Sequence, residues 1–209
     1  MQEDSRQYAP ATLRNREAIL ETLLQNLPPA GNILEISSGT GEHAVYFAPH
    51  LQPRQWIPTD PNPIAISSII AWQQHHPSPN LAAPFAIDVT TSNWDEQVQS
   101  QNLKYDIHAI VNINMIHIAP WTACLGLMSG ANKILPIGGI LYLYGSYKQN
   151  GKHTSPSNAD FDASLRDQNP AWGVRDLEEV IAVAAVQNLV LHKVQPMPAN
   201  NLSVFFQKI

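Results

Sequence analysis

Short apolar segments alternate with helical ones along most of this chain, and that alternation restricts the folds open to it. The apolar segments lie at 32–36, 56–60, 85–89, 107–113 and 140–144. Strands that are joined by helices run parallel to one another, with right-handed crossovers. Two later apolar segments flank the turn sequence Met-Pro-Ala-Asn-Asn and predict a hairpin that adds an antiparallel strand. The expected fold is therefore α/β and Rossmann-like, with a mostly parallel sheet and helices on both faces.

The remaining segments fit a single domain over residues 1–209. Leucines at helical spacing predict a helix over 10–27, which ends at Pro28-Pro29 because proline cannot continue it. Residues 145–175 are polar, aromatic and rich in turn formers, with little periodicity. A segment of this length and composition predicts a lid-like insertion beside a binding site.

Composition excludes several classes of function. The net charge is −5 and the basic residues form no cluster, so binding to duplex nucleic acid is not expected. No apolar run reaches the 18 residues of a membrane span, and no secretory signal is recognisable, so a cytoplasmic location is expected.

The single cysteine, Cys124, lies in an apolar helical stretch and is expected to be buried. No metal is expected, because the eight histidines lack the spacing of metal ligands.

The first apolar segment leads directly into the glycine turn Ser37–Gly41. In open parallel sheets, ligands bind beyond the carboxyl ends of the strands. By its letters the turn matches the dinucleotide pattern G-x-G-x-x-A, but Glu35 within the strand would repel a pyrophosphate. S-adenosylmethionine, with its ammonium and sulfonium, suits that carboxylate better. Asp60 ends the second apolar segment and could accept both ribose hydroxyls, so its hydrogen-bond partners are expected to belong to the ligand.

The sequence Leu34–Gly41 resembles the first motif of class I S-adenosylmethionine-dependent methyltransferases, with Asp60 and Asp88 at the positions of the second and third motifs. The chain more specifically resembles the methyltransferase-like 26 family, in the segments 34–44, 112–117, 153–158, 161–166, 172–176 and 197–202. This resemblance spans nearly the whole chain, from about Tyr8 to Gln207. It implies a seven-stranded methyltransferase fold with a cofactor site, and it implies no known substrate. Ser37 stands where the general motif has its first glycine.

These observations assign residues to three groups. The expected cofactor-binding residues are Asn15, Glu35, Ser37, Gly39, Thr40, Gly41, Asp60, Asp88, Val89 and Asn114. The candidate catalytic residues are Asn114, placed near the transferred methyl group, with His117 and His153 as bases for an acceptor that must lose a proton. The expected substrate-binding residues of the insertion are Tyr147, Asn158, Arg166, Trp172 and Arg175.

Each assignment has a structural alternative. Strand-end aspartates and Asn15 can cap helices, and His117 can pack beneath the insertion. Arg166 and Arg175 can pair with neighbouring aspartates and so fix a long segment in place.

The leading hypothesis for function is methyl transfer from S-adenosylmethionine to a small or medium-sized acceptor that is neutral or anionic. One alternative is a cofactor-binding or scaffold protein that keeps the fold without turnover. A nicotinamide-dependent reductase is a further alternative, which keeps the glycine pattern but is disfavoured by Glu35.

Overall fold

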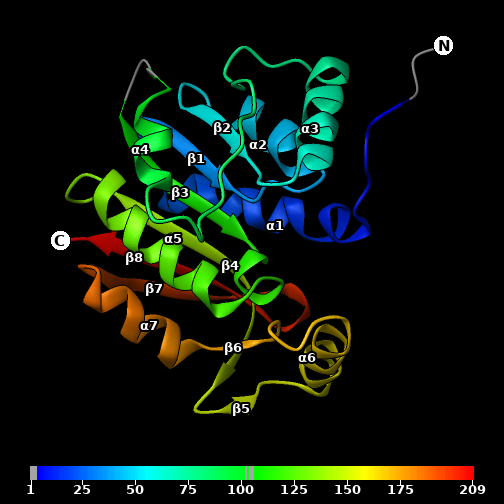
Figure 1. Cartoon of the computed structure of the whole chain (residues 1–209), viewed down its shortest axis with the longest axis vertical. Coiled ribbons are helices and arrows are strands. Elements are labelled where there is room, and N and C mark those ends of the chain that lie inside the picture. Colours follow the sequence, from blue (N-terminus) through cyan, green and yellow to red (C-terminus); the bar gives the residue numbers. More distant parts are fainter. Residues whose placement is uncertain (1–3, 102, 104–105) are drawn as a thin grey trace.

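The computed structural model, which describes residues 4–101, 103 and 106–209, is built on one mixed sheet (Figure 1). Its strands are β1 (Asn32–Ile36), β2 (Gln55–Thr59), β3 (Ile107–Ile113), β4 (Ile140–Gln149), β7 (Leu189–Met197) and β8 (Asn201–Lys208). They lie in the order β2-β1-β3-β4-β8-β7. The first four are parallel, and β8 runs antiparallel to both β4 and β7. The expected fold class is confirmed.

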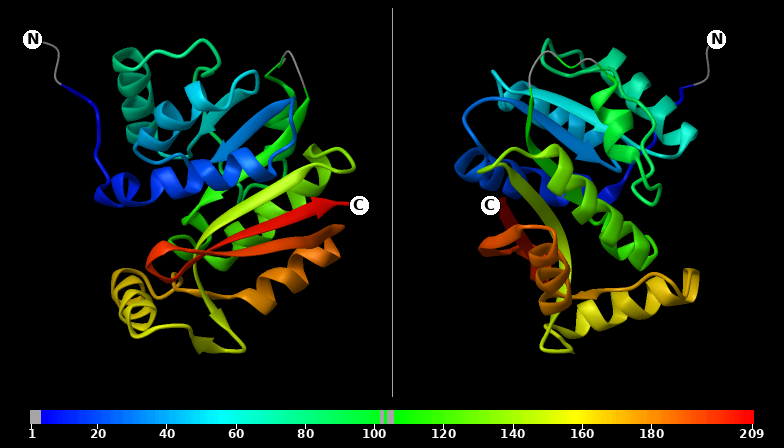
Figure 2. Two further views of the ribbon diagram at one scale, coloured as in Figure 1. Left: turned by 180° about the vertical axis from the view of Figure 1, so that it is seen from behind. Right: turned by 60° about the vertical axis from the view of Figure 1, so that its left-hand side comes forward.

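Helices cover both faces of this sheet (Figures 1 and 2). One face carries α1 (Pro10–Asn26) and α2 (Glu42–His50), with α3 (Pro63–His75) packed beside α2. The other carries α4 (Trp94–Gln99), α5 (Trp121–Ile134) and α7 (Leu177–Val186). Within β1, Ile33 packs with α1 and α2, whereas Leu34 and Ile36 belong to the core under α5. Every residue of β1 is buried, as is usual for a parallel strand covered on both sides.

The strand expected over 85–89 is the main difference at the sheet. Among the described residues, this region makes only isolated bridges to β2, from Phe85 and from Leu81, so it does not form a strand of the sheet. Pro84 offers no amide hydrogen for a ladder, and Asp88 turns the chain by accepting hydrogen bonds from Thr90.

The insertion at 145–175 is also more regular than its sequence predicts. Strand β4 continues to Gln149 and pairs with β5 (Lys152–His153) and β6 (Arg175–Asp176), and α6 (Pro156–Gln168) lies between those two short strands. The buried residues of α6 are Asn158, Asp162 and Leu165, which share one helical face. Because two of them are polar, a search for hydrophobic periodicity does not detect this helix.

Two short 3-10 helices complete the description, η1 (Met115–His117) after β3 and η2 (Pro198–Asn200) between β7 and β8. Among the described residues, no helix combines the length and apolar character that crossing a membrane requires.

Candidate functional site

The glycine turn follows β1 and leads into α2. Ser37, Gly39 and Gly41 all have positive φ, at 57°, 56° and 89°. A Cβ on Gly41 would lie 2.8 Å from the Cα of Ile69, so a side chain there is excluded, whereas one on Gly39 would meet nothing within 4 Å. The backbone of Gly39 is therefore open to a ligand. Ser38 fixes the turn to β2, since its amide donates to Thr59 O (2.8 Å) and its hydroxyl accepts from Thr59 N (3.1 Å).

Glu35 is a buried carboxyl group at the carboxyl end of β1. It accepts a hydrogen bond from Trp56 Nε1 (2.9 Å), and no described residue forms an ion pair with it. Burial, with a smaller contribution from the negative charge of nearby Asp60, raises the pKa of Glu35 to about 7 against the opposing hydrogen bonds of Trp56 and Ser38. Two carboxyl groups that repel each other favour a positively charged ligand at this position.

Asp60 follows β2 and is 6% exposed. Its Oδ2 accepts from the amide of Gly39 and its Oδ1 from the amide of Asn62, each at 2.9 Å. Burial raises the pKa of Asp60, and these two hydrogen bonds oppose the rise. The expectation that the partners of Asp60 belong only to a ligand is thus wrong, because this carboxylate also holds the glycine turn in place.

The segment before α1 lies against the same turn, beside α3 (Figure 1). The amide of Ala9 donates to Glu42 Oε2 (2.5 Å), which also accepts from the Thr40 hydroxyl (3.0 Å). The amide of Gln7 donates to Ser68 Oγ (2.8 Å), and that hydroxyl donates to Thr40 O (2.7 Å). Residues 7–9 and the glycine turn are therefore one hydrogen-bonded unit.

Asn15 lies within α1, so it is not a helix cap. Its Oδ1 accepts from His43 Nε2 (2.9 Å), and it also hydrogen-bonds with the hydroxyl of Tyr144. Burial, together with the positive charge of Arg16, lowers the pKa of His43 to about 4, so this imidazole is neutral and donates. Asn15 thereby connects α1 to the ends of the sheet.

Asn114 follows β3 in the left-handed region, with φ at 65°. Its amide donates to Tyr144 O (2.8 Å), and its side chain has no hydrogen-bond partner among the described residues. A backbone in this region is tolerated by asparagine at some cost, and such residues gather at functional sites. The half-buried carboxamide of Asn114 is therefore free to meet a ligand.

His117 is completely buried. Its Nδ1 accepts from the amide of Arg175 (3.3 Å), its ring packs edge-on against Tyr147 at 5.0 Å, and its Nε2 has no partner. Burial and the charge of Arg175 lower its pKa to about 3. The structure thus gives His117 the packing role considered as its alternative, and a base of such low pKa would take up a proton poorly at neutral pH.

His153 and Arg166 surround Asp162 on α6. Asp162 Oδ2 lies 3.0 Å from Lys148 Nζ and 3.2 Å from His153 Nε2, while Oδ1 accepts from Arg166 Nε (3.2 Å) and from the amide of Val174 (2.7 Å). The charge of Lys148 contributes to lowering the pKa of Asp162, against the effect of burial. This cluster fixes the insertion in place, as the alternative reading of Arg166 predicted.

The remaining residues expected to bind substrate or cofactor lie in different surroundings. Arg175 donates to Ile116 O (2.8 Å) and Ala119 O (2.7 Å), Tyr147 is fully buried with an unpartnered hydroxyl, and Trp172 is half-buried. Asp88 is exposed, and Val89 is buried beside it.

A cavity of about 320 Å³ lies beyond β3 and β4, enclosed by α1, α6 and the turn between β7 and β8. Its polar lining residues are Arg14, Asn15, Asn114, Tyr144, Ser146, Ser157, Asn158 and Asn201. Of the predicted site residues, it brings together Asn15, Asn114 and Asn158. Tyr144 and Ser146 are not among the site residues predicted from the sequence, although their alternate positions on one strand place their side chains on the same face of the sheet.

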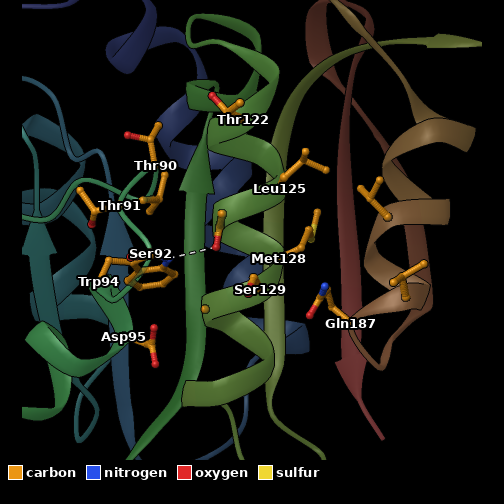
Figure 3. A pocket seen from close by; sticks show the side chains of 15 residues that line it. Thr90, Thr91, Ser92, Trp94, Asp95, Thr122, Leu125, Met128, Ser129 and Gln187 are labelled. Atoms are coloured by element: carbon orange, nitrogen blue, oxygen red, sulfur yellow. Dashed lines mark hydrogen bonds between the residues drawn. The ribbon is translucent and has the colours of Figure 1, made fainter.

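A larger groove, of about 510 Å³, runs along α5 (Figure 3). It lies between α5, the 89–95 segment and α7, with Gln187 on the side opposite Thr91. Its one carboxylate, Asp95, is paired with Lys133 at 3.0 Å, and Trp94 Nε1 donates to Gly126 O (2.9 Å). We therefore place the candidate site at the glycine turn and the smaller cavity, where polar groups gather and two of them, Arg14 and Asn114, have no side-chain partner among the described residues. No group of three or more histidine, cysteine or acidic side chains is placed to hold a metal within the described ranges.

Comparison with solved structures identifies the fold. An O-methyltransferase family protein from Burkholderia thailandensis matches with a TM-score of 0.77 and 11% identity, over 95% of this chain and 57% of that one. A putative O-methyltransferase from Nostoc punctiforme PCC 73102 gives 0.74 and 13%, over 92% and 56%. An O-methyltransferase family 2 protein from Planctomyces limnophilus DSM 3776, in complex with apigenin, gives 0.70 and 17%, over 93% and 62%.

At these identities the likeness shows the fold alone, which is the Rossmann-like fold of methyltransferases, and the chain spans less than two-thirds of the length of each of these proteins. A family model matches residues 6–208, nearly the whole chain. The chain belongs to that family, which is described as protein of unknown function (DUF938).

Proposed function

We propose that this protein is an S-adenosylmethionine-dependent methyltransferase that acts on a small or medium-sized acceptor. The observation that carries the proposal is the buried pair of Glu35 and Asp60, beside a glycine turn that is open at Gly39. No described cation pairs with either carboxylate. A ligand with an ammonium and a sulfonium would relieve the repulsion between these carboxylates, whereas a pyrophosphate would increase it. The finer resemblance to methyltransferase-like 26 stays a prediction.

The residues present fit this cofactor. Glu35 would attract its positive charge, and the backbone of Ser37, Gly39, Thr40 and Gly41 would contact it closely. Asp60 would accept from the ribose while keeping its bonds to Gly39 and Asn62, and Asp88, Val89, Asn15 and Asn114 would complete the contacts. When bound, S-adenosylmethionine supplies a methyl group that passes to a nucleophilic atom of the acceptor, while the electron pair of the broken bond remains on sulfur.

The protein's own task in such a reaction is alignment. Proximity and orientation can lower a barrier by roughly 7 to 11 kcal/mol. Of the two candidate bases, His117 offers little proton transfer because it is buried with a low pKa, and His153 is not among the described residues that line the cavity beyond β3 and β4. An acceptor that must lose a proton would release it to water. We include a small-molecule acceptor and no duplex nucleic acid in the proposal, on the grounds of cavity size and net charge.

Calorimetric titration with S-adenosylmethionine, S-adenosylhomocysteine and NADH tests the proposal. We expect micromolar binding of the two sulfur compounds and none of NADH, followed by methyl transfer from radiolabelled cofactor to a metabolite extract. Binding of NADH alone would indicate the reductase, and cofactor binding without transfer would indicate the scaffold protein. If the folded protein binds none of the three at millimolar concentration, the assignment is wrong.

Asp60→Ala provides the variant for this titration. We expect at least tenfold weaker binding of S-adenosylhomocysteine and a loss of about 1 to 3 kcal/mol of stability, because two amides lose their acceptor. The matched control is Asp160→Ala, which removes an exposed carboxylate of α6. Affinity equal to wild type in folded Asp60→Ala would exclude Asp60 from the cofactor site.

A further inference from the structure

The cavity of about 320 Å³ beyond β3 and β4 has positive charge and no negative charge among the described residues that line it. Of those residues, Arg14 is the only charged one, and none is an aspartate or glutamate. Arg14 is exposed on α1 and makes no hydrogen bond or ion pair with any residue that the structure describes. An unpaired guanidinium among neutral polar groups attracts an anion, and it presents donors that match a carboxylate.

The neutral part of the lining is held in position by the protein. Asn158 is 3% exposed, and its Nδ2 donates to Thr154 Oγ1 and to Asn200 O, each at 3.0 Å. Ser146 donates to Asn201 Oδ1 at 3.0 Å. These contacts join β4, α6 and the turn before β8, so the wall is built before any ligand arrives.

Asn114 connects this cavity to the strand edge. It lines the cavity, its carboxamide lacks a partner among the described residues, and its backbone is in the left-handed region directly after β3. A ligand in the cavity would thus lie next to the carboxyl ends of the strands, where the cofactor is proposed to bind.

We propose that this cavity binds the methyl acceptor, and that the acceptor is a compact organic anion whose carboxylate or similar group pairs with Arg14. The identity of the ligand as an acceptor rests on the proposed function. The volume is at the lower end of the range for small-molecule sites, about 300 to 1,000 Å³, which favours a compact molecule. A cationic acceptor would be repelled by Arg14 and would find no carboxylate in the lining.

Saturation-transfer NMR with a panel of compact carboxylic acids and their primary amides tests this proposal, with saturating S-adenosylhomocysteine. We expect at least one acid to bind tenfold more tightly than its amide, a difference of about 1.4 kcal/mol. Arg14→Gln should remove this preference. The control Lys152→Gln, which neutralises an exposed cation outside the cavity, should retain it.

A second pair of variants locates the binding. Ser157→Trp would fill the cavity from α6, and we expect it to abolish binding of the acid while the affinity for S-adenosylhomocysteine stays at the wild-type value. Ala163→Trp, on an exposed position of the same helix outside the lining, is the control and should bind as wild type.

The outcomes separate this inference from the proposed function. If S-adenosylhomocysteine binds but no acid is preferred to its amide, or if Arg14→Gln keeps the preference, the inference alone is wrong. If Ser157→Trp weakens S-adenosylhomocysteine binding to the same extent, the cavity belongs to the cofactor and the acceptor assignment is wrong. If acids bind through Arg14 while S-adenosylhomocysteine does not bind at all, the proposed function fails and the acceptor assignment fails with it.

Discussion

Replacing Glu35 by glutamine should make the ligand-free protein more stable at alkaline pH. Glu35 is buried without a cation, and its pKa is raised from 4.5 to about 7. Glutamine has nearly the same shape, and its carbonyl oxygen can still accept from Trp56 Nε1. It differs mainly in being unable to ionise, so the substitution isolates the free-energy cost of the buried charge.

The magnitude and the sign follow from the two pKa values. Between pH 4.5 and 7 the folded protein holds a proton on Glu35 that the unfolded chain releases, so stability falls as the pH rises through this range. Above pH 7 the loss is complete, and a change from 4.5 to about 7 corresponds to about 3 kcal/mol. At pH 5 the side chain is neutral in both folded proteins, and ionisation of Glu35 in the unfolded wild type accounts for about 0.8 kcal/mol. The rest of any difference at pH 5 is the constant cost of the buried amide.

Urea unfolding of wild type and Glu35→Gln at pH 5 and pH 8 measures this effect. The variant should gain about 2.5 kcal/mol relative to wild type between the two values, whereas Glu21→Gln, on the exposed side of α1, should gain nothing. Differences that stay constant from pH 5 to pH 8 would show that Glu35 is ionised at no cost. S-adenosylmethionine should bind wild type more tightly as the pH rises through 7, and Glu35→Gln should bind it weakly with no such dependence.

Three other changes have predictable results. Gly145→Ala would place a Cβ 2.5 Å from His117 Nε2, and overpacking of this kind should lower the urea midpoint by an amount equivalent to about 1 to 3 kcal/mol. Asp162→Asn should speed proteolysis within 150–174, because Lys148 and His153 lose their anion. Since the pKa of Asp162 lies below 3.8, its contribution is complete above pH 3.8 and is lost as the pH falls below that value. Burial raises the pKa of Cys124 to about 12, so thiol reagents at pH 8 should label it only when the protein unfolds, and rapid labelling of the native protein would contradict its burial.

The parts of the fold that sequence predicts well are those governed by local apolar pattern. The segments 32–36 and 107–113 are strands with the predicted bounds, and Pro28 follows the end of α1 closely. Sequence fails at 85–89, where an apolar composition suggests a strand but Pro84 and the turn at Asp88 limit pairing to isolated bridges. The missing amide hydrogen of Pro84 and the side-chain hydrogen bonds of Asp88 outweigh composition there.

For the site, sequence identifies residues at strand ends more readily than it identifies their partners. Glu35 and Asp60 do lie together, because parallel strands end at one edge of the sheet. Arg166 contacts Asp162 one helical turn earlier, a pairing that i,i+4 spacing allows, whereas His153 reaches Asp162 from β5, a contact between two elements that no local pattern encodes. The cavity was not predictable in detail, since its lining comes from α1, β4, α6 and β8, which are distant in the chain.

The hydrogen bonds from residues 7–9 to the glycine turn have a consequence for how ligand occupancy can be observed. Thr40 and Glu42 are shared between the two segments, so a ligand that restrains the turn also makes release of the preceding segment less favourable. By linkage, detaching that segment must weaken the ligand by the same factor. The amides of Gln7 and Ala9 would then exchange with deuterium more slowly in the presence of ligand. The exchange rates of these two amide protons, which lie outside the proposed contacts, would thus measure the fraction of protein that has ligand bound at the glycine turn.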